Sequence, residues 1–313
     1  MGNEKATRDS FGEALLAAGE ANPKLVVVSC DLSDATKTKE FGKKFPARFF
    51  EVGIAEQNGI SIAAGLALEG FRPFISSFGA FITGRYDQLR ISCAYNRAGV
   101  VIVGTHSGLA IGKDGATQMG TEDLNVISAL PGLQIFQPCD DAEAKAIVGY
   151  LSREKCLAYL RLSRRPQEQI HTEGYSFRFN KAEILREGNG ISIFATGDSV
   201  LHSLKAADKL NDEGIEADVV NFSTLKPIDR GAIIEFAGKR KAIVTVEDHS
   251  IIGGLGGRVC EVVAEAGLPC KVKRVGIRDC FGESGKPEDL YRKYGLDVEG
   301  IAKAVSGVAA SLK

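Results

Sequence analysis

Several classes of protein are excluded by what this 313-residue chain lacks. No apolar run approaches the roughly 20 residues of a membrane-spanning helix, and the start, MGNEKATRDSFGEALL, has charges where a signal peptide needs an apolar stretch. The seven cysteines are scattered, odd in number and without a CxxC pair, which indicates buried thiols in a reducing compartment. We therefore expect a cytoplasmic protein that does not enter a membrane.

A strong charge of either sign is also absent, because 39 basic and 40 acidic residues leave a formal net charge of -1. This balance argues against nucleic acid or an anionic membrane as the main partner. The chain has no Walker pattern, no G-x-G-x-x-G between a strand and a helix, and no zinc-like spacing of histidines and cysteines. We expect no metal ligand here, and any anionic ligand must be held by a local cluster of cations.

What the chain does contain is a regular alternation of apolar strands and helices. In the first half, strands are predicted at 25–30, 49–52, 73–78, 99–106, 133–136 and 157–162. Helices are predicted at 8–21, 56–68, 79–95, 121–130 and 141–151, with Thr121 as an N-cap. Such alternation is typical of βαβ units, and the nearly continuous apolar strands indicate a mostly parallel sheet that is covered on both faces.

The second half repeats this alternation after a polar segment. Composition changes at Ser163-Arg164-Arg165-Pro166 and stays polar to about Phe179, which indicates a domain boundary. Beyond it, strands are predicted at 191–196, 217–222, 242–246 and 272–277, and helices at 199–212, 229–238, 254–266 and 297–311. The fold class is therefore α/β, with two three-layer α/β/α domains: a first domain at 1–166, a linker at 167–182 and a smaller domain at 183–313.

Glu56 is the first candidate for chemistry. It stands in the first turn of a predicted helix, directly after the strand 49–52 and its Gly53. Ligands of open α/β sheets bind at the carboxyl ends of the strands, which is where this carboxylate falls. The alternative is a structural role, because a carboxylate in the first turn of any helix is favoured by the helix dipole.

A glycine-rich loop, THSGLAIGKDGATQMGTEDL, follows the strand 99–106 and supplies further polar candidates. Its glycines allow the backbone to turn tightly and to approach a ligand, and bring His106, Asp114 and Gln118 towards the same sheet edge. The alternative for His106 is a histidine that is satisfied by hydrogen bonds at the end of a strand.

Two aromatic residues and an arginine complete the candidate set. Phe78 and Phe81 flank a Gly-Ala pair after a strand, and either form part of the core or provide an aromatic cradle for a flat heterocycle. Arg164, in Ser163-Arg164-Arg165, either binds a phosphate through its planar guanidinium or belongs to a solvated basic linker.

These stretches together resemble a known family. FFEVGIAEQN, PFISSFGAF, THSGLAIGKDGATQMGTEDL and YLRLSRRP resemble the pyrimidine-binding domain of transketolases, and VEDHSIIGGLGG and SGKPEDLYRKYGLD resemble their C-terminal domain. The family binds the diphosphate of its cofactor and a divalent metal through a GDG-led motif in a further, N-terminal domain. Here Gly197-Asp198-Ser199 is the nearest approach and lies in the wrong domain. The resemblance therefore implies the C-terminal subunit of a split transketolase.

The resemblance implies a role in cofactor binding for three residues. Glu56 would hydrogen-bond the ring nitrogen of the aminopyrimidine of thiamine diphosphate, which requires Glu56 to be protonated or to share a proton with the ring. Phe78 and Phe81 would pack on the pyrimidine. The activity implied is transfer of a two-carbon ketol unit from a ketose phosphate to an aldose phosphate, as in the pentose phosphate pathway.

Other residues would bind the sugar. His106 and Asp114 match residues that contact it, His106 near the phosphate end, and Arg164 matches the phosphate-binding arginine. Gln118 stands where many members have histidine; it can hydrogen-bond a hydroxyl but cannot shuttle a proton near neutral pH. The family's phosphate-contacting serine has no single match in the loop 31–39, where alignments offer Ala35, Thr36 or Thr38.

The missing domain also implies an assembly. A separate N-terminal subunit would hold most of the diphosphate and Mg²⁺, and two such heterodimers would form a heterotetramer. The Ala63-Ala64-Gly65 face permits close approach of a helix across that interface, unless it packs within its own chain.

Two alternatives are weighed against this function. The first is a β-type subunit of another thiamine-diphosphate enzyme, either a 2-oxo acid dehydrogenase or a deoxyxylulose-phosphate-synthase-like chain. The KDGATQMGTEDL loop and the SRRP strand end favour a transketolase over it. The second is a non-catalytic relative that binds a partner, and the joint presence of Glu56, Phe78, Phe81, His106 and Asp114 argues against it.

Overall fold

Apolar strands build a seven-stranded sheet in the first half of the chain. The computed structural model describes residues 4–172 and 174–312. The spatial order is β12 (Thr224–Lys226), β6 (Gln134–Phe136), β7 (Ala158–Arg161), β5 (Val101–Thr105), β4 (Arg72–Phe78), β2 (Leu25–Ser29) and β3 (Phe49–Glu51). All neighbours are parallel except β12 and β6. Every residue of β2 and β5 is buried, as expected for central strands covered on both faces.

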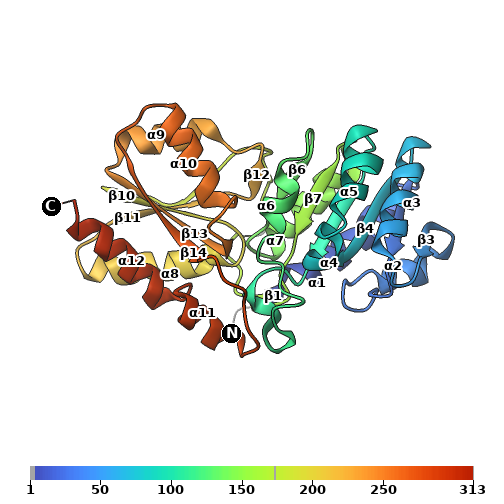
Figure 1. Cartoon of the computed structure of the whole chain (residues 1–313), viewed down its shortest axis with the longest axis horizontal. Coiled ribbons are helices and arrows are strands. Elements are labelled where there is room, and N and C mark those ends of the chain that lie inside the picture. Colours follow the sequence, from blue (N-terminus) through green and yellow to red (C-terminus); the bar gives the residue numbers. More distant parts are fainter. Residues whose placement is uncertain (1–3, 173, 313) are drawn as a thin grey trace.

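Helices cover both faces of this sheet (Figure 1). Val27 and Val28 point to opposite faces because side chains alternate along a strand. One face packs against α1 (Thr7–Ala21), α2 (Lys39–Lys44) and α7 (Asp141–Arg153). The other packs against α3 (Glu56–Leu68), the π-helix η2 (Leu89–Tyr95) and α6 (Asp123–Ser128).

The second half forms a five-stranded sheet that is likewise covered on both faces. Its order is β14 (Lys271–Ile277), β13 (Ala242–Ser250), β10 (Ile191–Ala195), β11 (Ala217–Asn221) and β9 (Glu183–Arg186), with β9 antiparallel to β11. One face packs against α8 (Ser199–Asp212), α11 (Pro287–Tyr294) and α12 (Val298–Ala310), and the other against α9 (Arg230–Lys239) and α10 (Leu255–Glu265). The predicted fold class is confirmed in both halves.

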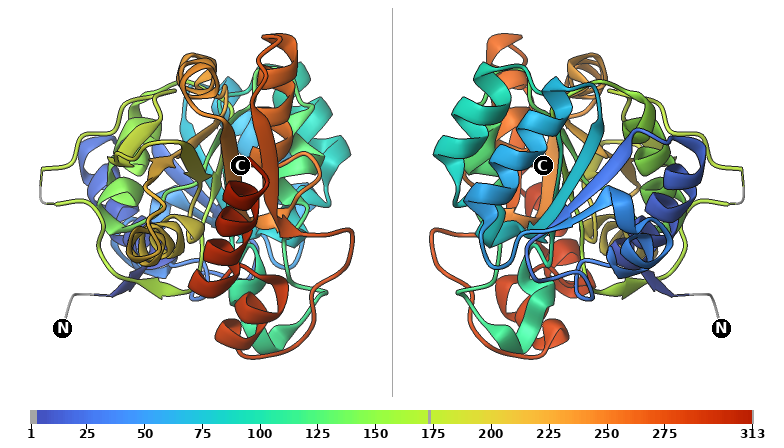
Figure 2. Two further views of the ribbon diagram at one scale, coloured as in Figure 1. Left: turned by 90° about the vertical axis from the view of Figure 1, so that its left-hand side faces the viewer. Right: turned by 90° about the vertical axis from the view of Figure 1, so that its right-hand side faces the viewer.

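The two units are joined more closely than their sequences suggest: β12 lies beside β6 in Figure 1, and the units lie one behind the other in the end-on views of Figure 2. Strand β12, from the second half, completes the first sheet at Phe136. Leu130 and Leu133 of the first unit belong to the same apolar cluster as Phe222 and Ile233 of the second. A small ribbon, β1 (Lys5–Ala6) with β8 (Pro166–Gln167), ties the start of the chain to the end of the first unit. The boundaries at 166 and 183 remain a prediction.

Two local predictions were wrong. The single helix expected at 79–95 is divided into α4 (Gly79–Thr83), α5 (Tyr86–Gln88) and η2, with Gly84 at the break. Helix α6 begins at Asp123, and Thr121 does not cap it: the Thr121 hydroxyl donates to the Glu122 carboxylate at 2.9 Å, and its carbonyl accepts from Ser250 N at 2.7 Å. Contacts with the second unit thus delay this helix by two residues.

The small-residue face of α3 also differs from expectation. Ala63 and Ala64 are buried against the sheet of their own chain, whereas Gly65 is exposed. The alanines therefore serve packing within the chain and are not available to a partner. Each helix in the described ranges is too short or too polar to cross a bilayer.

A buried histidine connects the two units. His171 places Nδ1 3.0 Å from Asp140 Oδ2 and Nε2 3.0 Å from Glu183 Oε2, so both nitrogens donate to carboxylates and the ring is an imidazolium. Burial alone would lower the pKa of His171, but the hydrogen bonds to Asp140 and Glu183 outweigh burial and raise it to about 10. Asp140 belongs to the N-terminus of α7 and Glu183 to β9, so this cation holds the segment between the units.

The same cluster has the composition of a metal site. Cys139, Asp140 and His171 lie close together, as do Glu143, His171 and Glu183. Both ring nitrogens of His171 already donate to carboxylates. Glu143 accepts hydrogen bonds from Asn221, Tyr175 and the amide of Cys139. Protein donors therefore already satisfy the groups that a metal would need.

We expect the His171 interaction to make stability depend on pH. Because the folded pKa lies above the ordinary value of about 6.5, the stabilisation is complete below pH 6.5 and declines as the pH rises towards 10. His171→Gln should lower the free energy of unfolding by about 3 kcal/mol at pH 6, and by much less at pH 10. Urea denaturation at both pH values measures this difference.

His202→Gln serves as the control. Burial lowers the pKa of His202, so its loss should leave the decline between pH 6.5 and 10 in place. A constant difference between wild type and His171→Gln across this range would contradict the imidazolium assignment.

Candidate functional site

The carboxyl edge of the first sheet gathers four of the predicted residues. Glu56 begins α3 directly beyond β3, Phe78 ends β4, and His106 follows β5. Phe81 lies one turn into α4, immediately after β4. Parallel neighbouring strands end at the same edge, which is why residues far apart in the sequence meet here.

Glu56 is buried, with 4% of its surface exposed, and its carboxylate is held from one side. The hydroxyl of Ser77 donates to Glu56 Oε1 at 2.8 Å. Within residues 4–172 and 174–312, no side chain or amide donates to the other oxygen, Oε2. The carboxylate is therefore fixed in orientation and retains one free acceptor.

Three rings stand side by side at the same sheet edge, and the central one, Phe78, directly follows Ser77 in the chain. The rings of Phe78 and Phe81 stack at 5.3 Å with 17° between their planes, and those of Phe78 and His106 at 3.9 Å with 27°. Both phenylalanines are only half-buried, so they are not pure core residues. They form an apolar wall that can receive a flat ring.

His106 is the centre of a chain of hydrogen bonds. Arg8 Nη1 lies 2.7 Å from His106 Nε2, and because a guanidinium only donates, Nε2 accepts. The proton is then on Nδ1, which donates to Thr105 Oγ1 at 2.9 Å. Burial, followed by the charges of Arg8 and Arg164, lowers the pKa of His106 to about 3, so this ring is neutral.

The anion-binding candidates lie on the other side of His106. Arg164 Nη1 donates to Asp114 Oδ2 at 3.1 Å, so the structure brings these two predicted residues together. Gln118 is half-buried, and its carbonyl oxygen accepts from the Thr117 hydroxyl at 2.7 Å. Gln118 has no hydrogen bond to another predicted site residue in the described part of the chain.

The loop 31–39 contributes through its backbone. Ala35 accepts from Arg8 Nη1 at 3.1 Å through its carbonyl oxygen. Thr36 and Thr38 are buried, and their hydroxyls lie 3.3 Å apart within the loop. The two threonine hydroxyls are thus turned inwards, and Ala35 lies nearest to the arginine.

The sequence analysis missed Arg8, Ser77 and Thr105. Each acts on a predicted residue: Ser77 orients Glu56, while Arg8 and Thr105 fix the tautomer of His106. Ser77 and Thr105 could have been predicted as site residues, because they are polar residues at the carboxyl ends of β4 and β5, two central parallel strands that end at the same edge of the sheet. Arg8 lies 98 residues from His106 and carries no local signal.

The glycine-rich loop is fixed by a residue of the second unit. The amide of Leu109 donates to both oxygens of the Asp248 carboxylate, at 3.0 and 3.1 Å, and the Tyr291 hydroxyl donates to it at 2.6 Å. Gly108 has φ +79°, and a Cβ there would lie 2.2 Å from Asp248. Only glycine allows this approach.

The buried ion pair of Arg161 and Asp123 supports the same contact between the glycine-rich loop and the second unit. Arg161 donates through Nε to Asp123 at 3.0 Å, and through Nη2 to the carbonyl oxygens of Gly120 and Asp248 at 2.8 and 3.0 Å. Tyr159 also donates to Asp123, at 2.6 Å. The loop from Gly108 to Gly120 is therefore held at both ends by groups that reach the second unit.

Family comparisons agree with this geometry. Residues 3–167 match the model "Transketolase, pyrimidine binding domain", and residues 180–301 match "Transketolase, C-terminal domain". This chain belongs to the transketolase family.

Individual relatives extend over nearly the whole chain. A protein of Methanocaldococcus jannaschii, provisionally named transketolase C-terminal section, is 43% identical over 304 residues, which cover 96% of this chain and 95% of that protein. The 6-deoxy-6-sulfo-D-fructose transketolase subunit of a Clostridium species is 39% identical over 302 residues, with 96% and 94% covered.

A solved structure shows the same arrangement. It is described as a split-gene transketolase, inactive beta4 tetramer, and superposes with a TM-score of 0.88 at 40% identity, covering 97% of this chain and 98% of that one.

The residues present fit the pyrimidine of the family's cofactor. Glu56 Oε2 is a free acceptor or proton-sharing oxygen at a buried position, and the wall of Phe78 and Phe81 lies at the same sheet edge, beginning at the residue after Ser77. A transketolase needs such a carboxyl group opposite a ring nitrogen and an apolar surface for the ring. Both elements come from this chain.

Loss of the Asp248 carboxylate should loosen the glycine-rich loop. Asp248→Ala leaves the Leu109 amide and the Tyr291 hydroxyl without an acceptor, at a cost of about 2 to 4 kcal/mol in the free energy of unfolding. We expect faster hydrogen exchange at the Leu109 amide under conditions where the protein remains folded.

Tyr291→Phe is the matched control, because it removes the other hydrogen bond and leaves the carboxylate on Leu109. It should keep the Leu109 amide protected. Equal protection in Asp248→Ala would show that the loop is held by other contacts.

Proposed function

We propose that this chain is the C-terminal subunit of a two-subunit, thiamine-diphosphate-dependent transketolase that transfers a two-carbon ketol unit from a ketose phosphate to an aldose phosphate. The observation that carries the proposal is the buried Glu56, held on one oxygen by Ser77 and free on the other, at the sheet edge that also presents the ring wall. The relatives reported above are named as transketolase parts, which favours this reaction over other thiamine-diphosphate chemistry.

In this proposal three residues serve the cofactor. Thiamine diphosphate, when bound, supplies the nucleophilic carbon and the electron sink for two-carbon transfer. Glu56 Oε2 holds or shares a proton with the pyrimidine ring nitrogen, and Ser77 keeps the carboxyl group in that orientation. Phe78 and Phe81 pack on the ring and exclude water from it.

The sugar is bound by the polar residues around His106. Arg8 and Arg164 place positive charge near the neutral histidine, which suits the anionic end of a sugar phosphate. Asp114 and Gln118 are the residues of the loop that can hydrogen-bond sugar hydroxyls. The Clostridium relative is named for a sulfonated sugar, so an anionic ketose is the class proposed, with the pentose phosphates as its first members.

The assembly is part of the same proposal. The related solved structure is described as inactive in a tetramer of one subunit type, which supports a need for a separate N-terminal subunit. That partner would hold most of the diphosphate and Mg²⁺, and two heterodimers would form the active heterotetramer. Ile54, two residues before Glu56, is 84% exposed and lies where the partner must close the site. The free cysteines support a cytoplasmic location.

The decisive experiment reconstitutes both subunits. The chain is mixed with candidate N-terminal transketolase subunits, thiamine diphosphate and Mg²⁺, and assayed with a ketose donor plus an aldose acceptor, or with pyruvate. We expect ketol transfer only in the mixture. Glu56→Gln keeps the size of the side chain and its bond to Ser77 but removes the carboxyl group, and should lower kcat at least about 100-fold.

Glu69→Gln is the control, since it makes the same change at an exposed position at the other end of α3. It should leave the rate unchanged. Turnover of pyruvate without a sugar acceptor would identify a 2-oxo acid enzyme instead, and wild-type activity in Glu56→Gln would remove this residue from the mechanism.

A further inference from the structure

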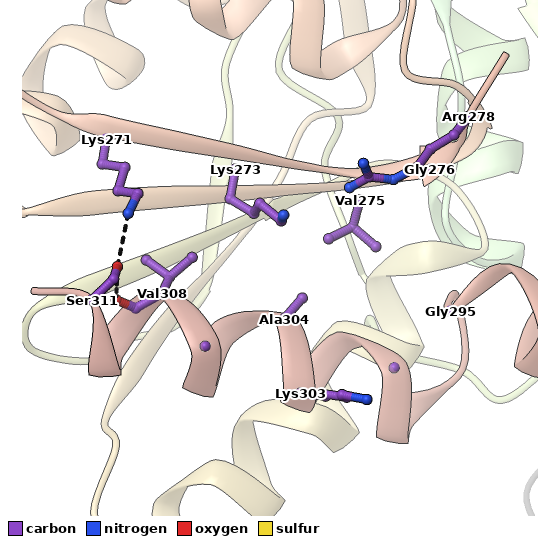
Figure 3. Close-up of a pocket in the computed structure, with 12 residues that line it drawn as sticks. Lys271, Lys273, Val275, Gly276, Arg278, Gly295, Lys303, Ala304, Val308 and Ser311 are labelled. Carbon is purple, nitrogen blue, oxygen red and sulfur yellow. Dashed lines mark hydrogen bonds between the residues drawn. The ribbon is translucent and has the colours of Figure 1, made fainter.

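A groove lies between the edge strand of the second sheet and its last helix, far along the chain from the site above (Figure 3). Strand β14 is the edge of that sheet, and Lys271, Lys273 and Val275 alternate onto the face that looks at α12. On α12, Ala304 and Gly307 offer little or no side chain to the strand. The space left between them is about 500 Å³, within the range of small-molecule sites.

The groove carries charge of one sign. Lys271, Lys273, Arg278 and Lys303 line it, and none of its lining residues is acidic. In the part of the chain that the structure describes, Lys273, Arg278 and Lys303 form no ion pair, and Lys271 donates only to the Ser311 hydroxyl, at 2.8 Å. This concentration of positive charge stands out in a chain whose net charge is -1.

Neighbouring cations behave differently. Lys209 on α8 pairs with Glu299 on α12, and Lys293 on α11 pairs with Glu283. Acidic partners are thus available on the same side of the sheet, but the groove has none. No acidic lining residue offsets its four cations, so the groove favours an anion from outside the chain.

The spacing of the cations defines the ligand. Lys271 and Lys273 are two residues apart on one strand, about 7 Å, and Arg278 lies beyond the far end of the strand. A single phosphate cannot reach all of them, whereas linked phosphates can bridge neighbouring cations such as Lys271 and Lys273. We propose that this groove binds a small molecule with linked phosphates, either an inorganic polyphosphate or the polyphosphate of a nucleotide. Val275 and Val308 provide apolar surface for an attached organic group.

The test is direct binding of inorganic tripolyphosphate, ATP and inorganic phosphate to the full chain, by calorimetry at about 0.15 M salt. We expect saturable binding of tripolyphosphate, at least tenfold tighter than that of phosphate. If ATP binds more tightly than tripolyphosphate, the ligand of the groove is a nucleotide. If the two bind equally, the groove recognises the phosphate chain alone. This site does not depend on the proposed catalytic function, and the assay requires no partner subunit.

Two kinds of variant locate the binding. Lys273→Gln with Lys303→Gln should weaken it at least tenfold, and Lys181→Gln with Lys239→Gln, which removes two charges outside the groove, should not. Gly307→Leu should also abolish binding by filling the groove, since a Cβ at Gly307 meets open space and the helix is preserved. Gly257→Leu adds the same side chain to α10, also in open space, and should bind normally.

The proposal is overturned if no saturable binding occurs, or if the groove and control variants behave alike. It is also overturned if Arg164→Gln abolishes binding while the groove variants retain it, because the anion would then occupy the candidate active site. Thermal unfolding of each variant establishes that it is folded. The charge variants and the filling variant change the groove in different ways, so loss of binding in both kinds of folded variant cannot be attributed to misfolding.

Discussion

One buried carboxylate decides how the two halves of this transketolase chain form a single site. Asp248 lies in the polar last part of β13, beyond the apolar residues that begin this strand, and its oxygens accept from the amide of Leu109 and the hydroxyl of Tyr291. A buried carboxylate is costly without such donors, so the loop must lie where its amide can reach. The position of the loop, and with it that of Asp114, is therefore set from a different domain than the one that carries Glu56.

The second domain also explains the glycines of this loop. A Cβ at Gly112 would meet Pro287, the first residue of α11, and a Cβ at Gly115 would meet Ser284, in the segment between β14 and α11. Both glycines have positive φ, so close approach and backbone conformation require the same residue type. The C-terminal domain thus determines the conformation of the glycine-rich loop, in addition to its role in packing.

The sequence predicted what depends on periodicity and strand order. Glu56, Phe78 and His106 could be grouped because the carboxyl ends of parallel strands share one edge. Arg8 and Asp248 could not be assigned, since each acts on a residue about 100 or more positions away and neither has a local pattern. The predictions of a single helix at 79–95 and of a helix start at Thr121 failed for a similar reason, because tertiary contacts outweighed local propensity. β12 was missed because three residues are too few for a periodic signal.

The two cations of the site are held differently, and this affects how an anion can enter. Arg8 donates to a carbonyl and to a neutral histidine, so its charge is oriented but uncompensated. Arg164 is paired with Asp114, but both side chains are about one third exposed, and such pairs contribute little to stability. Under the proposed function, a phosphate would therefore take over Arg164 at small cost, and the released Asp114 would be free to accept from a sugar hydroxyl. The same exchange would order both ends of a sugar phosphate in one step.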